Sequence, residues 1–198
     1  MSNTPSLDFA QLHNHYLLMR HGHSQGNAMG LIVSSPEHGL GGYGLSTKGQ
    51  EQILVRLAEW HLAPPERVLY SDFLRTKETA LRVAEHFDVP SAPEPRLRER
   101  FFGELDMLPD SAYQQVWDED ARNPDHTGGG VESVRQVANR LIEVIQELEK
   151  GYQQATLLLV SHGDPLQILL TAAAGHDLRS HREHFPLAPA DIRPLIGH

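Results

Sequence analysis

The sequence predicts an α/β protein, a three-layer α/β/α sandwich with a mostly parallel central sheet. Short apolar segments alternate along the chain with helix-like segments, which is typical of a sheet that carries helices on both faces. Two of the apolar segments, residues 16–19 and 156–160, lead into the same His-Gly pattern, at His21 and at His162. These observations indicate a single domain over residues 1–198 with a ligand site where strands end.

The elements of the first half follow from local patterns. Residues 16–19 form a short apolar run and predict the first strand. Residues 47–60 predict a helix, because Thr47 and Gln50 have the spacing of a capping box. Residues 68–70 then predict a second strand.

The second half continues the alternation. Residues 76–86 predict a helix, and residues 131–150 predict the clearest one, with apolar residues on one stripe about five turns long. The apolar strand 156–160 leads into a helix whose first turn contains Pro165, and residues 191–195 predict a last strand.

Residues around 104–130 are predicted to form a lid over the sheet. The stretch contains glycine and proline and has no strong period, apart from a short helix signal over residues 111–117. It also carries seven acidic residues against Arg122 alone: Glu104, Asp106, Asp110, Asp118, Glu119, Asp120 and Asp125.

Composition narrows the class of protein. The 198 residues are 39% hydrophobic and 22% charged, as in ordinary globular proteins. The chain has no cysteine, which excludes disulfides, thiolate metal sites and cysteine nucleophiles. No apolar stretch is long enough to cross a bilayer, and residues 1–10 lack the pattern of a secretory leader, so a cytoplasmic location is expected.

The charge balance narrows the class of partner. With 26 acidic and 17 basic residues, the formal net charge of −9 argues against a nucleic acid or an anionic membrane as the main partner. A local anion site is still possible, because an arginine within about 4 Å of a phosphate contributes roughly 4 kcal/mol of gross attraction at an intermediate dielectric.

The two His-Gly patterns predict where that anion site lies. If their strands are parallel neighbours, His21 and His162 meet at one edge of the sheet, where open α/β sheets bind ligands. Arg20 precedes the first histidine, and Gly163 comes just before a predicted helix whose free backbone N–H groups favour an anion. The alternative for each histidine is a polar cap at a strand end.

The segment Leu18-Met19-Arg20-His21-Gly22-His23-Ser24-Gln25-Gly26-Asn27 resembles the signature of the histidine phosphatase superfamily, also called phosphoglycerate-mutase-like. Further segments resemble the family in the same order and cover most of the chain: residues 43–49, 70–80, 97–103, 130–133 and 160–163. His23 stands where an acidic residue is more usual, and its side chain is expected either at the pocket wall or in solvent.

The resemblance implies a phosphoglycerate-mutase-like fold and a nucleophile. His21 would attack phosphorus through a ring nitrogen and form a phosphohistidine intermediate. Glu99 resembles the family's proton donor, which protonates the leaving oxygen and then accepts a proton from water. The rival reading of Glu99 is a surface ion pair with its neighbouring arginines.

The resemblance also implies a set of phosphoryl ligands. Arg20, Arg75 and His162 would hold the phosphoryl oxygens, and Asn27 would donate a further hydrogen bond. Arg75 could instead be a surface arginine, and Asn27 a turn residue. No metal and no cofactor is expected, because the chain's own cations supply the charge, and the N-terminal histidines are interpreted as solvated.

The expected function is that of a metal-independent histidine phosphatase, a phosphomonoesterase for a small phosphorylated metabolite. The expected partner is that substrate or inorganic phosphate, and the sequence indicates no oligomeric state. A phosphoglycerate-type mutase is the first alternative. The acidic lid argues against it, because acidic residues would repel the trianionic substrates of such a mutase. The second is a phosphohistidine-protein phosphatase or a non-catalytic phosphoryl-binding protein.

Overall fold

The structure, a computed structural model, describes residues 7–197 and is built on one five-stranded sheet of order β3-β2-β4-β1-β5. The first four strands pair in parallel, and β5 runs antiparallel to β1. The predicted parallel pairing of the two histidine-bearing strands is therefore confirmed. The strands are β1 His15–Arg20, β2 Arg67–Tyr70, β3 Ser91–Pro93, β4 Thr156–Ser161 and β5 Ile192–Pro194.

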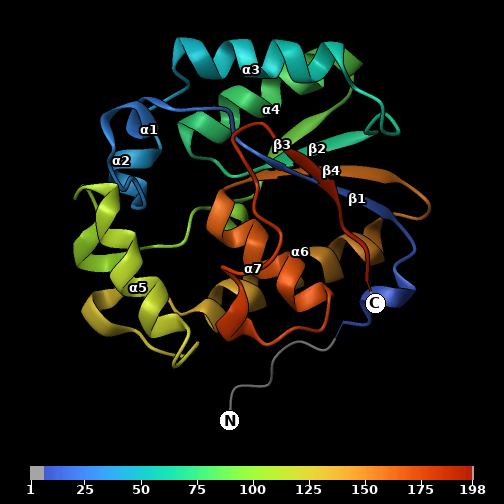
Figure 1. The fold of residues 1–198 in the computed structure, drawn as a ribbon. Helices are drawn as coiled ribbons and strands as arrows, with labels where there is room; N and C mark the ends of the chain where they lie inside the picture. The colour runs from blue at the N-terminus through green and yellow to red at the C-terminus, as the bar shows by residue number, and fades with distance from the viewer. Residues whose placement is uncertain (1–6, 198) are drawn as a thin grey trace.

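Helices cover both faces of this sheet, as Figure 1 shows, with α3 and α4 on one face and α6 and α7 on the other. The three-layer α/β/α architecture predicted from the sequence is confirmed. The helices are α1 Gln25–Met29, α2 Pro36–Gly39, α3 Thr47–Ala58, α4 Leu74–Phe87, α5 Tyr113–Asp120, α6 Val134–Gly151 and α7 Gly163–Ala173. Single 3-10 turns lie at Phe9–Gln11, Pro95–Leu97, Gly103–Leu105, Asp110–Ala112, Gly128–Gly130 and Leu178–Ser180.

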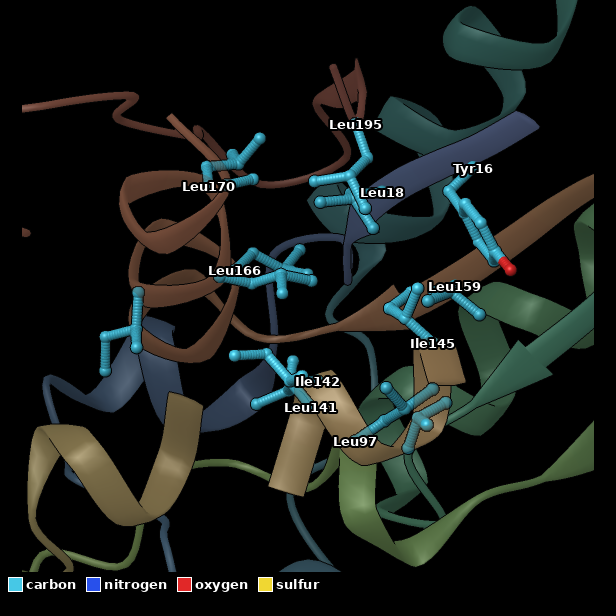
Figure 2. Close-up of a cluster of buried hydrophobic side chains, with 14 of the residues drawn as sticks. Tyr16, Leu18, Leu97, Leu141, Ile142, Ile145, Leu159, Leu166, Leu170 and Leu195 are labelled. Atoms are coloured by element: carbon cyan, nitrogen blue, oxygen red, sulfur yellow. The ribbon is translucent and has the colours of Figure 1, made fainter. Parts of the chain in front are cut away.

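The core consists of two apolar layers that share β4, whose six residues are all buried. Leu157 and Leu159 pack with α6 and α7, whereas Leu158 and Val160 pack with α3 and α4 on the other face. Figure 2 shows the first layer, where Leu159 lies near Ile145. This two-sided burial explains why β4 reads as a continuous apolar run instead of an alternating one.

α3 begins at Thr47 as predicted, but with a different cap, and α6 begins at Val134, three residues later than predicted. The cap of α3 is Ser46, whose hydroxyl accepts a hydrogen bond from the backbone N–H of Gly49, so the predicted box at Thr47 is off by one residue. In α6, Ser133 and Gln136 form the capping box. The capping box sets the first helical residue at Val134. Val131, which the apolar stripe had wrongly included, therefore lies outside the helix.

The other differences concern short elements. No local sequence pattern predicted α1, α2 or β3, each of five residues or fewer. The short helix expected over residues 111–117 is α5, displaced toward its C-terminal end. Of residues 1–10, used above for the leader expectation, residues 1–6 lie outside the described part of the chain.

A search of residues 7–197 finds no helix with both the length and the apolar composition of a membrane span.

Candidate active site

His21 and His162 lie side by side at the ends of β1 and β4. The register pairs Arg20 with Ser161, so the next residue of each strand is one of the two histidines. Their rings meet edge to face with centroids 5.2 Å apart. Both side chains are buried, which brings two imidazoles from distant parts of the sequence into one site.

His21 has one basic ring nitrogen available for chemistry. Its Nδ1–H donates to the backbone carbonyl of Gly22 at 2.6 Å, so the lone pair lies on Nε2, where it accepts a hydrogen bond from Arg75 Nε at 3.2 Å. Burial, followed by the charges of Arg75 and Arg20, holds the pKa of His21 well below its usual value. The imidazole is therefore neutral at neutral pH and can act as a nucleophile.

Two guanidiniums approach the histidines. Arg75, the second residue of α4, is buried, and its Nη2 donates to the carbonyl of Val33 at 2.8 Å. Arg20 Nη1 donates to the carbonyl of Leu187 at 2.7 Å. The surface alternative for Arg75 is therefore wrong, since the beginning of α4 points its side chain into the site and not into solvent.

Ser71 and Glu99 lie next to the two ring nitrogens of His162. Its Nε2 is 2.8 Å from the hydroxyl of Ser71, and its Nδ1 lies 3.8 Å from Glu99 Oε2. Burial and then the charge of Arg75 lower its pKa well below the usual value. Both histidines are thus neutral near pH 7.

Three buried nitrogens in this site donate to no residue in the part of the chain that the structure describes: Arg20 Nε, Arg75 Nη1 and His162 Nδ1. Buried polar nitrogens in folded proteins are almost always paired, so three in one place indicate a site that receives acceptor oxygens from a ligand. His162 Nδ1 is a donor to such a ligand in the tautomer whose Nε2 accepts from the hydroxyl of Ser71. Two of the three belong to positively charged guanidiniums, which suit an oxyanion.

Glu99 lies against this cluster and is largely buried, with 10% of its side chain exposed. Its Oε1 accepts a hydrogen bond from the backbone N–H of Arg100 at 2.9 Å, and its Oε2 lies 3.7 Å from Arg75 Nη2. Burial raises the pKa of Glu99 to about 7, against the lowering effect of Arg75. The surface ion-pair reading of Glu99 is wrong, because the side chain is largely buried and its arginine partner is Arg75, not one of its neighbours in the sequence.

Three further residues follow the two histidine-bearing strands: His23 and Asn27 come after β1, and Gly163 comes after β4. The backbone of Gly163, the first residue of α7, packs on Arg20: a Cβ there would be 3.3 Å from the Arg20 Cζ. Asn27 Oδ1 accepts from both the N–H and the hydroxyl of Ser24 at 3.0 Å, which is a helix-capping role. A phosphoryl contact from its amide nitrogen stays a prediction.

His23 neither forms the pocket wall nor points freely into solvent. Its Nδ1 lies 2.7 Å from the hydroxyl of Ser46, the cap of α3. The ring therefore fastens the loop after β1 to the beginning of that helix.

A side pocket of about 160 Å³ opens next to the histidines. Arg20 and Glu99 form its inner wall, and Tyr113, Trp117 and Arg182 form part of its outer wall. Sequence reasoning missed these three outer residues. The four-residue spacing of Tyr113 and Trp117 could have placed both rings on one helix face, but nothing local marked Arg182.

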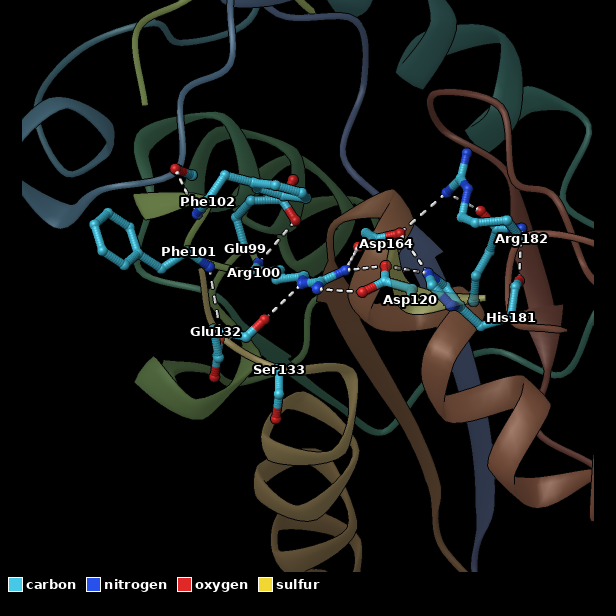
Figure 3. Close-up of polar contacts among 12 residues, drawn as sticks. Glu99, Arg100, Phe101, Phe102, Asp120, Glu132, Ser133, Asp164, His181 and Arg182 are labelled. Carbon is cyan, nitrogen blue, oxygen red and sulfur yellow. Dashed lines mark hydrogen bonds and ion pairs between the residues drawn. The ribbon is translucent and has the colours of Figure 1, made fainter. Parts of the chain in front are cut away.

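A buried ion cluster supports the pocket wall, and Figure 3 shows its members pointing toward one another. Arg100 holds Asp120 through two hydrogen bonds of 2.7 and 2.8 Å and reaches Asp164 at 3.2 Å. Asp164 also accepts from His181 at 3.1 Å and from Arg182 at 3.2 Å. These partners outweigh burial and lower the pKa of Asp164.

The acidic lid residues do not line the side pocket. Several have partners elsewhere: Ser34 and Ser35 donate to Asp106, Arg122 pairs with Glu119 and Arg135 with Asp125, and Asp120 belongs to the ion cluster. These residues lie off the pocket lining, and the expected repulsion of trianionic substrates by this segment stays a prediction.

Comparison with known proteins gives a family match over nearly the whole chain. The model of the histidine phosphatase superfamily (branch 1) matches residues 16–195. A metal-independent phosphoserine phosphatase of Arabidopsis thaliana is 31% identical over 162 residues, which are 77% of this chain and 66% of that protein. An adenosylcobalamin/α-ribazole phosphatase of Salmonella typhimurium is 31% identical over 160 residues, 77% of this chain and 76% of that protein.

Solved structures show the same fold. A mycobacterial glucosyl-3-phosphoglycerate phosphatase superimposes with a TM-score of 0.76 at 20% identity and covers 91% of this chain and 88% of that one. The same mycobacterial protein has been solved in complex with inorganic phosphate, with a TM-score of 0.75 at 19% identity and coverage of 91% and 88%.

Proposed function

Since this chain belongs to the histidine phosphatase superfamily and is a phosphoric monoester hydrolase, we propose that it acts through a phosphohistidine on His21, without a metal. The observation that carries the proposal is the set of three buried nitrogens, without a partner among residues 7–197, in the same site as a neutral imidazole. Such a set can hold the oxygens of a phosphoryl group while the imidazole attacks its phosphorus.

In the first step, His21 Nε2 forms a bond to phosphorus as the bond from phosphorus to the ester oxygen breaks. Arg20, Arg75 and His162 hold the remaining phosphoryl oxygens, which carry the charge through the transfer. Glu99, protonated in part at neutral pH because its pKa is about 7, gives its proton to the leaving oxygen. The alcohol departs neutral.

In the second step, the Glu99 carboxylate takes a proton from water. The water oxygen bonds to phosphorus, the bond from phosphorus to Nε2 breaks, and inorganic phosphate leaves. The first-step donor is thus the second-step base, as reversal of proton direction requires. Glu99 also lines the side pocket, so the alcohol part of the substrate lies there.

The substrate is a small phosphorylated metabolite. The relatives are named for phosphoserine and for α-ribazole, and the side pocket of about 160 Å³ suits a compact leaving group. These two observations favour hydrolysis of a free metabolite over that of a phosphoprotein, whose chain would not enter a cavity of this size.

The test is to trap the intermediate. Rapid quench of the enzyme with radiolabelled phosphomonoester in EDTA should give a denatured protein with acid-labile, base-stable label. His21→Ala should remove the label and lower phosphate release by at least about 10³-fold, because the nucleophile is lost. His61→Ala, at an exposed histidine outside the site, is the control and should keep both.

Label that persists in His21→Ala, or is missing from wild type during turnover, would disprove the phosphohistidine route. Activity that disappears in EDTA and returns with an added divalent metal would disprove the metal-free part.

A further inference from the structure

We propose that Arg182 forms a subsite in the side pocket for a carboxylate carried by the leaving group. This inference rests on the proposed function and names its substrate class: phosphomonoesters of compact hydroxy acids or amino acids. The recognition chemistry is a planar guanidinium fork facing a planar carboxylate.

The first observation is which nitrogens of Arg182 are in use. Nη1 alone makes its hydrogen bonds, to Asp164 at 3.2 Å and to the side-chain oxygen of Gln167. Nε and Nη2 donate to no residue within 7–197, and in Figure 3 the free end of the guanidinium extends away from the ion cluster. About a third of the side chain is exposed, so a ligand can reach it.

The second observation is what these two nitrogens do elsewhere in the chain. Arg98 binds Asp72 with Nε and Nη2, each at 2.7 Å. Arg140 binds Glu132 with the same pair, at 2.7 and 3.0 Å. This edge of a guanidinium matches the two oxygens of a carboxylate, and in Arg182 it has no partner among the described residues.

The third observation is that Arg182 is already fixed in place. Its Cζ stacks over the indole of Trp117, 3.7 Å from the ring centroid, while Asp164 holds Nη1 from the side. Asp164 is itself held by Arg100 and His181. A carboxylate that binds here therefore does not have to order a long, flexible side chain, so little binding free energy is lost to side-chain entropy.

The fourth observation is the position of Arg182 relative to the reacting atoms. It lines the same cavity as Arg20 and Glu99, and its charge is near enough to Arg20 to contribute to lowering the pKa of that guanidinium. A cavity of about 160 Å³ has room on the order of five water molecules. A phosphate at Arg20 and a carboxylate at Arg182 must then belong to one short molecule.

The test compares substrates that differ only in the carboxylate. O-phosphoserine and O-phosphoethanolamine are one such pair, and 3-phosphoglycerate and glycerol phosphate are a near-matched second. In wild type, kcat/KM should favour the carboxylate member of each pair by about tenfold or more. In Arg182→Gln the ratio should fall to within about threefold of one, because the fork is removed.

Two further variants keep the result interpretable. Arg179→Gln removes a neighbouring exposed arginine whose one ion pair within residues 7–197 is with Asp177, and it should keep the wild-type ratio. Arg182→Lys keeps the charge without the fork and should lower the ratio at least about threefold. Should the glutamine variant fail to fold, the lysine variant carries the test.

A wild-type ratio near one, or a full wild-type ratio in either Arg182 variant, would overturn the carboxylate subsite. Hydrolysis of p-nitrophenyl phosphate keeps this apart from the proposed function. Where that hydrolysis depends on His21 but the substrate ratio is near one, only the subsite is wrong. Where it survives in His21→Ala, the proposed mechanism is wrong as well.

Discussion

Glu99 shows at the scale of one residue how burial changes the chemistry of a side chain. A carboxyl group in water is ionised at neutral pH, but burial raises the pKa of this one to about 7 even though Arg75 lies nearby. The two histidines are shifted in the opposite direction by the same cause. A proton donor and an unprotonated nucleophile therefore coexist at one pH.

We expect the pH dependence of phosphoryl transfer to follow from these shifts. As pH rises through about 7, Glu99 loses its proton, so kcat/KM for an alkyl phosphate should fall. As pH falls, His21 gains a proton only well below its usual pKa, so the acidic limb should lie far below neutrality. The measurement is kcat/KM against pH.

Glu99→Gln should remove the basic limb and lower kcat/KM for an alkyl phosphate by about 10²–10⁴-fold. The loss should be smaller with p-nitrophenyl phosphate, whose leaving group needs no proton. Glu94→Gln is the control, because Glu94 pairs with Arg96 outside the site. A basic limb that survives in Glu99→Gln would mean that another group donates the proton.

At the scale of elements, α5 is the piece that completes the side pocket. It has only eight residues, too few for a stable isolated helix, so its contacts must hold it in place. Tyr113 and Trp117 line the pocket, Val116 packs with Phe102, and Asp120 enters the buried ion cluster. One face of a short helix thus combines recognition and attachment.

Asp120→Asn should loosen this attachment. The guanidinium of Arg100 is fully buried, and losing its main countercharge should cost about 3–5 kcal/mol of unfolding free energy. Backbone hydrogen exchange in α5 should also accelerate. The measurements are urea unfolding and exchange mass spectrometry.

Asp118→Asn is the matched control on the same helix. Asp118 is exposed and bonded to Gln114, so its loss should change stability by less than about 0.5 kcal/mol. Equal effects of the two substitutions would show that the ion cluster contributes little to holding α5.

How much of the fold the sequence could predict depended on the length and regularity of each element. The strands before His21 and His162 are apolar runs with a sharp end, and both were placed to within a residue. The beginning of α6 was misplaced because Val131 continues the apolar period, while the capping box at Ser133 decides where the helix starts. Elements as short as β3 have no period to detect.

The residues of the site also differ in how far the sequence could predict them. His21, His162, Arg20 and Arg75 were brought together as expected, because strand ends and a helix start fix them. Arg182 could not be predicted: its place depends on a stack with Trp117, 65 residues away, and no local pattern reports such a contact.

At the scale of the whole molecule, the two apolar layers are joined through β4. Ile145 is fully buried in the layer that packs α6 and α7 on one face of β4. The other layer packs α3 and α4 on the opposite face of the same strand. The two faces should therefore unfold together as one cooperative unit.

Ile145→Ala should lower the free energy of unfolding by about 2–5 kcal/mol. Far-ultraviolet circular dichroism and loss of phosphatase activity should report the same shifted midpoint in urea. Val55→Ala, at a position 54% exposed on α3, is the control and should leave the midpoint nearly unchanged. Separate midpoints for the two signals would show that the layers are not coupled.

The place of β4 between β1 and β2 has a consequence for biosynthesis. β1 and β2 do not pair with each other, and β4, Thr156–Ser161, which lies between them, is made after both. Until it leaves the ribosome, the growing polypeptide carries two apolar strands whose inner edges have no neighbour and can pair with other chains. We therefore expect the sheet to close only after residue 161 has been made.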